Sequence, residues 1–216
     1  MKNTVELLSH FGDDLTVVNV ARVSYGKEVE EFTEKDAKLI KYLVNHKHTS
    51  PFRHPQLQFR ITCPIYVERQ LFKHQIGMSA NSISGRYVDF SDTYTKIDVF
   101  RKQSSDSKQG SEGVLNGVDN EHAKQIQKMV IQWTSKAYKD LIDLGVSKEQ
   151  ARTILPLNLN TTFIWTGSLL SYIHLWNLRL KSDTQTETRE VAQQMLDLVK
   201  NIEGNPFEHT LNAFNL

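Results

Sequence analysis

The spacing of apolar residues predicts that helices make up most of this chain. Ala37, Ile40 and Leu43 recur at helical intervals behind Thr33, a residue type that begins helices, so a helix is predicted up to about Asn45. The same spacing predicts later helices at 126–141, 168–180 and 185–202. Ser147 with Gln150 predicts a capping box for a further short helix that carries Arg152 and stops before Pro156.

Two segments instead alternate apolar and polar residues, which is the period of a half-buried strand. One is 56–62, and the other contains Leu159, Thr161, Phe163 and Trp165. Because strands are few and do not alternate regularly with helices, the predicted fold class is α+β. We expect a single domain over residues 1–216, with a small mixed sheet and several helices. The segment 101–120 is poor in large apolar residues and is predicted to be a surface loop.

Pro64 is predicted to begin one more helix, from Ile65 to about Gly77, because the first position of a helix needs no N–H donor. Five residues fall on one arc of roughly 140° of this helix: Tyr66, Arg69, Gln70, Lys73 and His74. A solvated face is the ordinary explanation of such an arc. The mixture of an aromatic ring, an amide, two cations and an imidazole nevertheless makes it a candidate site.

Composition and charge narrow the classes of function. The 26 Lys and Arg residues nearly balance the 25 Asp and Glu residues, so no global field favours a nucleic-acid backbone. The single cysteine, Cys63, rules out an internal disulfide and is typical of a reducing cytosol. No stretch approaches the roughly 20 apolar residues of a membrane span. We therefore expect a cytoplasmic protein with neither a membrane nor a nucleic-acid partner.

The segment 73–87 is a basic stretch that leads into a loop rich in small hydroxyl residues and is closed by Arg86. Such a loop offers backbone N–H groups, serine hydroxyls and a guanidinium fork, which together suit a phosphate group. Taken alone, a serine- and glycine-rich loop of this kind is more often a simple connection.

This segment resembles the signature of the flavin-dependent thymidylate synthases, which normally reads Arg-His-Arg, seven residues and then Ser, with Asn-Glu-x-Ser-x-Arg-Tyr at its end. The matching residues are His74, Asn81, Ser84, Arg86 and Tyr87. Further blocks match in the same order between about residues 21 and 190: Ala21–Tyr25, His48–His54, Pro64–Phe72, Ala151–Leu159 and Asn177–Arg179. Several blocks in register are far more specific than any single motif.

The chain also departs from the family pattern. Lys73 and Gln75 replace the two arginines, Ser82 replaces the usual Glu, and eight residues instead of seven precede Ser84. Ser168 and Leu170 stand where the family often has Asn and Arg for the flavin. Lysine lacks the bidentate fork of arginine, so the contact at Lys73 must differ in detail. We interpret the chain as a divergent branch of the family, for which a phage-like origin is one option.

The resemblance implies reductive methylation of dUMP to dTMP by a homotetramer with shared active sites. Methylenetetrahydrofolate would donate the one-carbon unit, and FADH2, recharged by NADPH, would donate the hydride. Arg179 would be the catalytic residue, acting on the uracil ring. The residues implied for dUMP are Gln70, Lys73, Ser82, Ser84, Gly85, Arg86, Arg152 and Arg179. Those implied for FAD are Ser24, His48, Lys73, His74, Gln75, Asn81, Ser168 and His174.

Two other functions stay open: a flavoprotein of the same fold with another reductive activity, and a non-enzymatic module that binds nucleotides or nucleic acid. The second would favour clustered basic and aromatic residues, whereas the charges here are dispersed. The three histidines His46, His48 and His54 match no familiar metal-ligand spacing, so no metal is expected. Cys63 has no context that would activate a thiol, and we interpret it as a structural residue.

Overall fold

The computed structural model describes residues 3–89, 93–106, 108 and 110–216. The chain divides into two compact units. The first, called the sheet unit, consists of Thr4–Ile61, Leu71–Asn81 and Phe163–Leu216. The second, called the α4 unit after its longest helix, consists mainly of Thr62–Gln70 and Ser82–Thr162. Each unit is described by itself.

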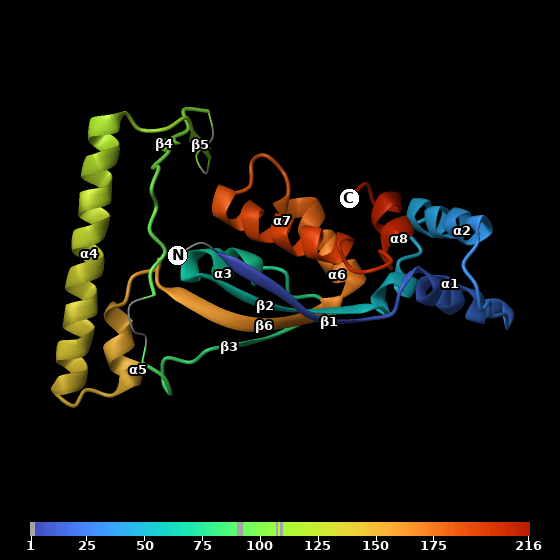
Figure 1. Ribbon diagram of the computed structural model, residues 1–216, viewed down its shortest axis with the longest axis horizontal. Helices are drawn as coiled ribbons and strands as arrows, with labels where there is room; N and C mark the ends of the chain where they lie inside the picture. Colours follow the sequence, from blue (N-terminus) through green and yellow to red (C-terminus); the bar gives the residue numbers. More distant parts are fainter. Residues whose placement is uncertain (1–2, 90–92, 107, 109) are drawn as a thin grey trace. The chain divides into compact units, whose positions relative to one another are not determined.

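The central element is a four-stranded sheet with the strand order β1-β2-β6-β3 (Figure 1). The strands are β1 (Thr4–Phe11), β2 (Gln56–Pro64), β6 (Asn160–Ser168) and β3 (Met78–Ser82). The Gln58 amide lies 2.9 Å from the Thr166 hydroxyl, and Thr62 and Thr162 share a hydroxyl contact of 2.8 Å, so β2 and β6 run antiparallel. The α+β class is confirmed, and the sheet is antiparallel, whereas the sequence predicted a mixed one.

The two strands predicted from alternation are both present. On β2, Leu57, Phe59 and Ile61 are completely buried and alternate with more exposed polar residues. On β6, Phe163 and Trp165 are buried in the same manner. Burying one such side chain is worth about 1.5–3 kcal/mol, which explains why the period-two pattern fixes which face of the strand points inward.

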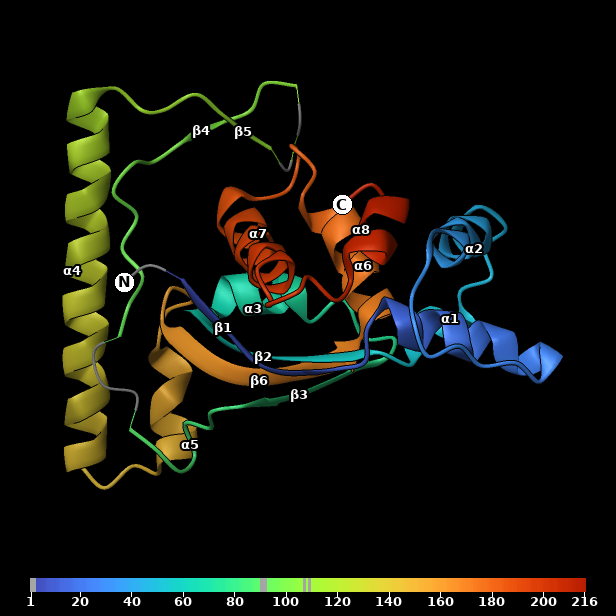
Figure 2. The same ribbon diagram turned by 45° about the vertical axis from the view of Figure 1, so that its right-hand side comes forward.

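Two helices lie along one face of the sheet within the sheet unit (Figures 1 and 2). They are α6 (Leu169–Arg179) and α7 (Thr186–Lys200), both close to the predicted ranges. Tyr172 and Trp176 of α6 are fully buried, and Tyr172 makes an edge-to-face contact with Trp165 of β6. The face of α6 that is not buried in the core therefore carries its less buried residues, among them Arg179.

The rest of the sheet unit is helical: α1 (Asp14–Arg22), η1 (Val23–Tyr25), α2 (Glu34–Asn45), η2 (Ser50–Arg53) and α8 (Glu208–Ala213). The start of α2 is confirmed, because Thr33 and Asp36 form a reciprocal capping box. Helix α1 was not predicted. It begins with a second capping box, in which Asp13 accepts from the backbone N–H of Thr16 at 2.7 Å.

The α4 unit holds α3 (Ile65–Leu71), the two short strands β4 (Lys102–Gln103) and β5 (Ser111–Glu112), α4 (Gly117–Asp143), α5 (Lys148–Ala151) and η3 (Arg152–Ile154). Within the predicted surface loop 101–120, the described residues include the β4–β5 pair and the first turn of α4; residues 107 and 109 lie outside the described residues. Helix α4 begins early because the Asn116 side chain accepts from the N–H of Asp119.

Two local predictions were wrong. The helix that follows Pro64 ends at Leu71 and not near Gly77, because the chain turns there and the N–H of His74 bonds back to the carbonyl of Leu71. Lys73 and His74 therefore lie beyond the helix. Ser147 does not form the predicted capping box: its side chain makes no cap, and its carbonyl accepts from the N–H of Gln150. Among the described residues, no helix combines the length and apolar character needed to cross a membrane.

Candidate functional site

The turn after α3 brings together residues from two separate motifs. In the sheet unit, Nε of Arg179, at the end of α6, donates to Nε2 of His74 at 3.0 Å. His74 comes from the signature segment and Arg179 from the Asn177–Arg179 block. Both side chains are partly buried. The structure thus places the predicted catalytic arginine in direct contact with a predicted flavin residue.

The contact defines the state of the imidazole. Burial, the charge of Arg179 and the nearby His174 together lower the pKa of His74 from its ordinary value to about 4. At neutral pH the ring is uncharged, and because Nε2 accepts from Arg179, the proton resides on Nδ1. His74 thereby orients the guanidinium and presents an Nδ1–H donor. Burial also lowers the pKa of Arg179, but a guanidinium stays charged at any physiological pH.

The other end of the turn is held by the start of α6. The Ser171 hydroxyl donates to the carbonyl of Ile76 at 2.9 Å and contacts the Ser168 hydroxyl at 2.7 Å. Gly77 has a φ of +70°, and a Cβ at this position would lie 2.5 Å from Oγ of Ser171. Glycine is therefore required both by the backbone conformation and by the close approach to α6. Ser168, predicted to bind flavin, is buried and caps α6.

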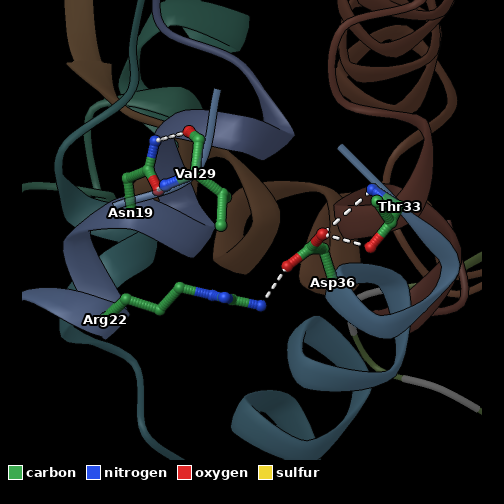
Figure 3. Close-up of polar contacts among 5 residues, drawn as sticks. All are labelled: Asn19, Arg22, Val29, Thr33 and Asp36. Carbon is green, nitrogen blue, oxygen red and sulfur yellow. Dashed lines mark hydrogen bonds and ion pairs between the residues drawn. The ribbon is translucent and has the colours of Figure 1, made fainter. Parts of the chain in front are cut away.

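Ser24 lies in η1, the short helix that directly follows Arg22. The turn that contains it is closed by hydrogen bonds between its two ends (Figure 3). The Asn19 side chain both donates to and accepts from the backbone of Val29, each at 2.9 Å. Arg22 pairs with Asp36, which also caps α2 through Thr33. Burial would raise the pKa of Asp36, but the Thr33 hydrogen bonds and the charge of Arg22 outweigh it and lower the pKa.

The closed turn also borders a cavity of about 570 Å³. Its lining includes Asn19 and Val20 of α1 together with Val23, Gly26 and Lys27 of the turn. Ser24, in the same turn, is exposed.

The segment predicted as a hydroxyl-rich loop is a loop only in part, because Met78–Ser82 form strand β3. The part that follows β3 lies in the α4 unit and carries the predicted phosphate ligands. Oγ of Ser84 accepts from the backbone N–H of Arg86 at 3.3 Å, so the serine shapes the loop locally. Nε of Arg86 faces Glu149 at 3.5 Å, and more than half of each side chain is exposed. An exposed pair at this distance is worth only about 0–1 kcal/mol, so a phosphate dianion would easily replace the carboxylate. Arg152 begins η3 in the same unit and is exposed.

One acidic residue near this loop was missed by the sequence analysis. The Ser82 hydroxyl donates to Oε1 of Glu68, on α3, at 2.9 Å. Burial raises the pKa of Glu68, and the Ser82 hydrogen bond and the charge of Arg69 lower it in part. The signal was present in the sequence, because Glu68 stands directly before Arg69 in a matched block.

The remaining predicted residues divide by unit and by exposure. Gln70 and the buried Gly85 lie in the α4 unit with Ser82, Ser84, Arg86 and Arg152. Among the predicted site residues, those that are exposed and belong to the sheet unit are Ser24, His48, Lys73, Gln75, Asn81 and His174. All the predicted flavin residues thus belong to the sheet unit, whereas most of the predicted dUMP residues belong to the α4 unit.

Cys63 lies on β2 and is 1% exposed. Burial, with a smaller contribution from the charge of Glu68, raises the pKa of its thiol to about 12. A thiol in this state is neither ionised nor accessible at neutral pH, as its interpretation as a structural residue requires.

Comparison with known proteins places these features in a family. The family described as "Thymidylate synthase complementing protein" matches residues 6–203. A flavin-dependent thymidylate synthase from Thermus thermophilus is 41% identical over 199 residues, which cover 92% of this chain and 72% of the relative. The enzyme of that name from Kosmotoga olearia is 37% identical over 211 residues, which cover 98% and 91% of the two chains.

Solved structures agree with this result. The UMP/dUMP methylase PolB from Streptomyces cacaoi, solved with 5-Br dUMP bound, superposes with a TM-score of 0.86 at 26% sequence identity. The match covers 99% of this chain and 95% of that one. The fold and its relatives define the chain as a methyltransferase. More specifically, it belongs to the flavin-dependent thymidylate synthase family.

Proposed function

We propose that the protein methylates dUMP to dTMP, with methylenetetrahydrofolate as the one-carbon donor and FADH2, recharged by NADPH, as the hydride donor. Family membership supports the reaction. The observation that carries the assignment of roles is the 3.0 Å contact between Arg179 and His74, which joins two motif blocks that are 105 residues apart. Such a contact is expected if both residues serve one site.

In this proposal Arg179 faces the uracil ring. A fixed cation beside N3 favours the deprotonated ring, because an opposite charge at contact distance shifts a pKa by about 1–3 units. The anionic ring makes C5 nucleophilic enough to attack the one-carbon unit without a cysteine adding at C6. The buried Cys63, with its raised pKa, is consistent with a mechanism that needs no thiolate. The neutral imidazole of His74 accepts a hydrogen bond from the guanidinium and so fixes its direction. It adds no second positive charge beside it.

The phosphate of dUMP would bind to the loop that contains Ser84, Gly85 and Arg86, and to Arg152. Forked guanidinium groups and hydroxyls suit a phosphate dianion, and charge-assisted hydrogen bonds are about twice as strong as neutral ones. Gln70 and Lys73 complete the proposed set. The exposure of Arg86 and Arg152 leaves their charges accessible to the ligand.

The residues proposed for FAD fit the chemistry of that group. Hydroxyl, imidazole and amide side chains match the donors and acceptors of a flavin ring, and the exposed ammonium of Lys73 suits a diphosphate. No carboxylate belongs to the proposed set. His48, His74, Asn81 and Ser24 are the main candidates, with Gln75 and His174 as secondary ones. Ser168, whose hydroxyl caps α6, would act by holding the helix that carries His174 and Arg179.

We further propose a homotetramer with shared active sites, located in the cytoplasm. Light scattering combined with absorbance near 450 nm (roughly, as for free flavins) measures mass and bound flavin together. The expected result is a tetramer that loses its flavin when it dissociates. A stable monomer that keeps its flavin would contradict shared sites.

The reaction is tested by tritium release from [5-³H]dUMP, with folate, FAD and NADPH each omitted in turn. Release is expected with the complete mixture and should fall to background when the folate is omitted. A yellow protein that oxidises NADPH but never releases tritium would instead support a flavoprotein with another reductive activity. A colourless protein that binds nucleotides would support the non-enzymatic alternative.

The role of Arg179 is tested in the same assay at saturating dUMP. Arg179→Ala should lower turnover by about 10² or more, because a charge contact in the transition state is worth several kcal/mol. Arg179→Lys should recover only part of this loss, since it restores a point charge without the planar fork. Arg189→Ala is the matched control, because the Arg189 side chain donates to the carbonyl of Ser182 and has no proposed role. Normal turnover in Arg179→Ala would make this arginine structural.

A further inference from the structure

Glu68 is a half-buried carboxylate whose position is not explained by stability. It lies on α3, and Oε1 accepts a hydrogen bond of 2.9 Å from the hydroxyl of Ser82. Withdrawing a carboxylate from water is unfavourable unless donors or opposite charges replace the lost hydration, and the Ser82 hydroxyl and the charge of Arg69 do so only in part. Burial accordingly raises the pKa of Glu68. A perturbed carboxylate beside a proposed ligand residue is a typical feature of a functional site.

The sequence pattern gives a second, independent reason to consider this residue. The family signature normally has Glu where this chain has Ser82, so the chain has lost a carboxylate at that position. The structure brings another carboxylate to the same place from α3, fourteen residues earlier in the chain. Serine is two carbons shorter than glutamate, which leaves room for the Glu68 side chain to reach its hydroxyl. The hydrogen bond between them then fixes both groups.

We propose that Glu68 is a substrate-binding residue that, together with Ser82, accepts a hydrogen bond from the nucleoside part of the nucleotide. This inference rests on the proposed function, because it assigns a new contact within the same site. The carboxylate repels a phosphate dianion, so Glu68 faces the opposite end of the ligand from Arg86 and Arg152. The group able to donate to it is a sugar hydroxyl, because the proposed mechanism assigns the N3 position of the uracil to Arg179.

The proposal predicts that the carboxylate can be moved between the two positions. Glu68→Ala should weaken dUMP binding by about tenfold or more, the scale of losing a hydrogen bond to a charged group. Adding Ser82→Glu to Glu68→Ala should restore binding to within about threefold of the parent. Ser82→Glu alone should weaken binding, because it places two carboxylates side by side. If Glu68 had a purely structural role, Ser82→Glu would not weaken dUMP binding in the parent and restore it in Glu68→Ala.

Glu121→Ala is the matched control. Glu121 is an exposed carboxylate on α4 in the same unit, paired with Lys124 at 2.8 Å, and its removal should leave dUMP binding unchanged. Thermal unfolding of every variant shows that the affinities refer to folded protein. If Glu68→Ala unfolds, Glu68→Gln keeps the shape of the side chain and should still weaken binding severalfold, because the amide carries no charge.

A nucleotide analogue tests whether Glu68 accepts from the sugar hydroxyl. The effect of Glu68→Ala should disappear with 2′,3′-dideoxyuridine 5′-monophosphate, which lacks that hydroxyl. An undiminished effect with this analogue overturns the proposal, as does dUMP affinity in Glu68→Ala equal to that of the parent. A parent protein that binds no dUMP refutes the proposed function itself, which is a different result.

Discussion

Replacing Gly77 with alanine tests whether the turn after α3 depends on its close approach to α6. The substitution introduces two separate costs. The backbone φ of +70° strains any residue with a Cβ, by about 1–2 kcal/mol. The new methyl group would also lie 2.5 Å from Oγ of Ser171, so this serine must move away from the Ile76 carbonyl that it contacts.

The second cost is the one that the structure specifies. Leaving a buried hydrogen-bonding group unpaired costs about 1–3 kcal/mol, so Gly77→Ala should destabilise the protein by roughly 2–5 kcal/mol in total. Gly204→Ala is the matched control, because Gly204 has a φ of +75° in the same unit but nothing lies within 4 Å of a Cβ there. Only the strain applies to Gly204. The difference between the two variants isolates the contact with Ser171.

Thermal unfolding followed by circular dichroism measures this difference. For a chain of this size, about 1 kcal/mol corresponds to a change in Tm of roughly 2–4 °C, so Gly77→Ala should melt several degrees below Gly204→Ala. In a Ser171→Ala background the clashing oxygen is absent, and the cost of Gly77→Ala should fall to that of Gly204→Ala. Equal melting temperatures of the two single variants in the parent background would refute the reasoning.

Three further predictions concern the site. Cys63→Ser and Cys63→Ala should keep turnover within about tenfold of the parent, and a loss of about 10³ in a folded variant would show an essential thiol. Because folding lowers the pKa of His74 to about 4, its contribution to the free energy of unfolding is complete above pH 6.5 and disappears as the pH falls towards 4. His74→Asn should therefore flatten the pH dependence of the unfolding free energy over this range. An unchanged pH profile would refute the assignment. Lys73→Arg should leave the affinities for dUMP and FAD within about tenfold of the parent, whereas a tenfold or greater weakening of both would show that the site is built around lysine.

Periodicity predicted the elements whose burial is regular. Phe163 and Trp165 alternate with polar residues on β6, and their burial leaves one strand register possible. Helix α2 was predictable because Thr33 and Asp36 are local to its start and form their capping box without help from the rest of the fold. In each case the determining interaction lies within a few residues of the sequence or repeats along it.

The elements that were missed depend on contacts between distant segments. Helix α3 ends at Leu71, although polar spacing continues through His74, because the turn is held by Ser171, nearly a hundred residues later. The Arg179–His74 contact likewise joins segments whose proximity no local pattern encodes. Glu68 lies in a matched block of the sequence, but its proximity to Ser82 becomes visible only in the fold.

The two substituted positions of the signature, Lys73 and Gln75, show how the site tolerates divergence. Both side chains are exposed, whereas His74 between them is partly buried and bonded to Arg179. The turn is also fixed through the backbone of Ile76 and the conformation of Gly77, which do not depend on the side chains at 73 or 75. Changes at the exposed positions can therefore alter ligand contacts without moving the imidazole or the guanidinium. The same logic applies to Ser82 and Glu68, where the residue at one position changes and the carboxylate is supplied from a neighbouring helix.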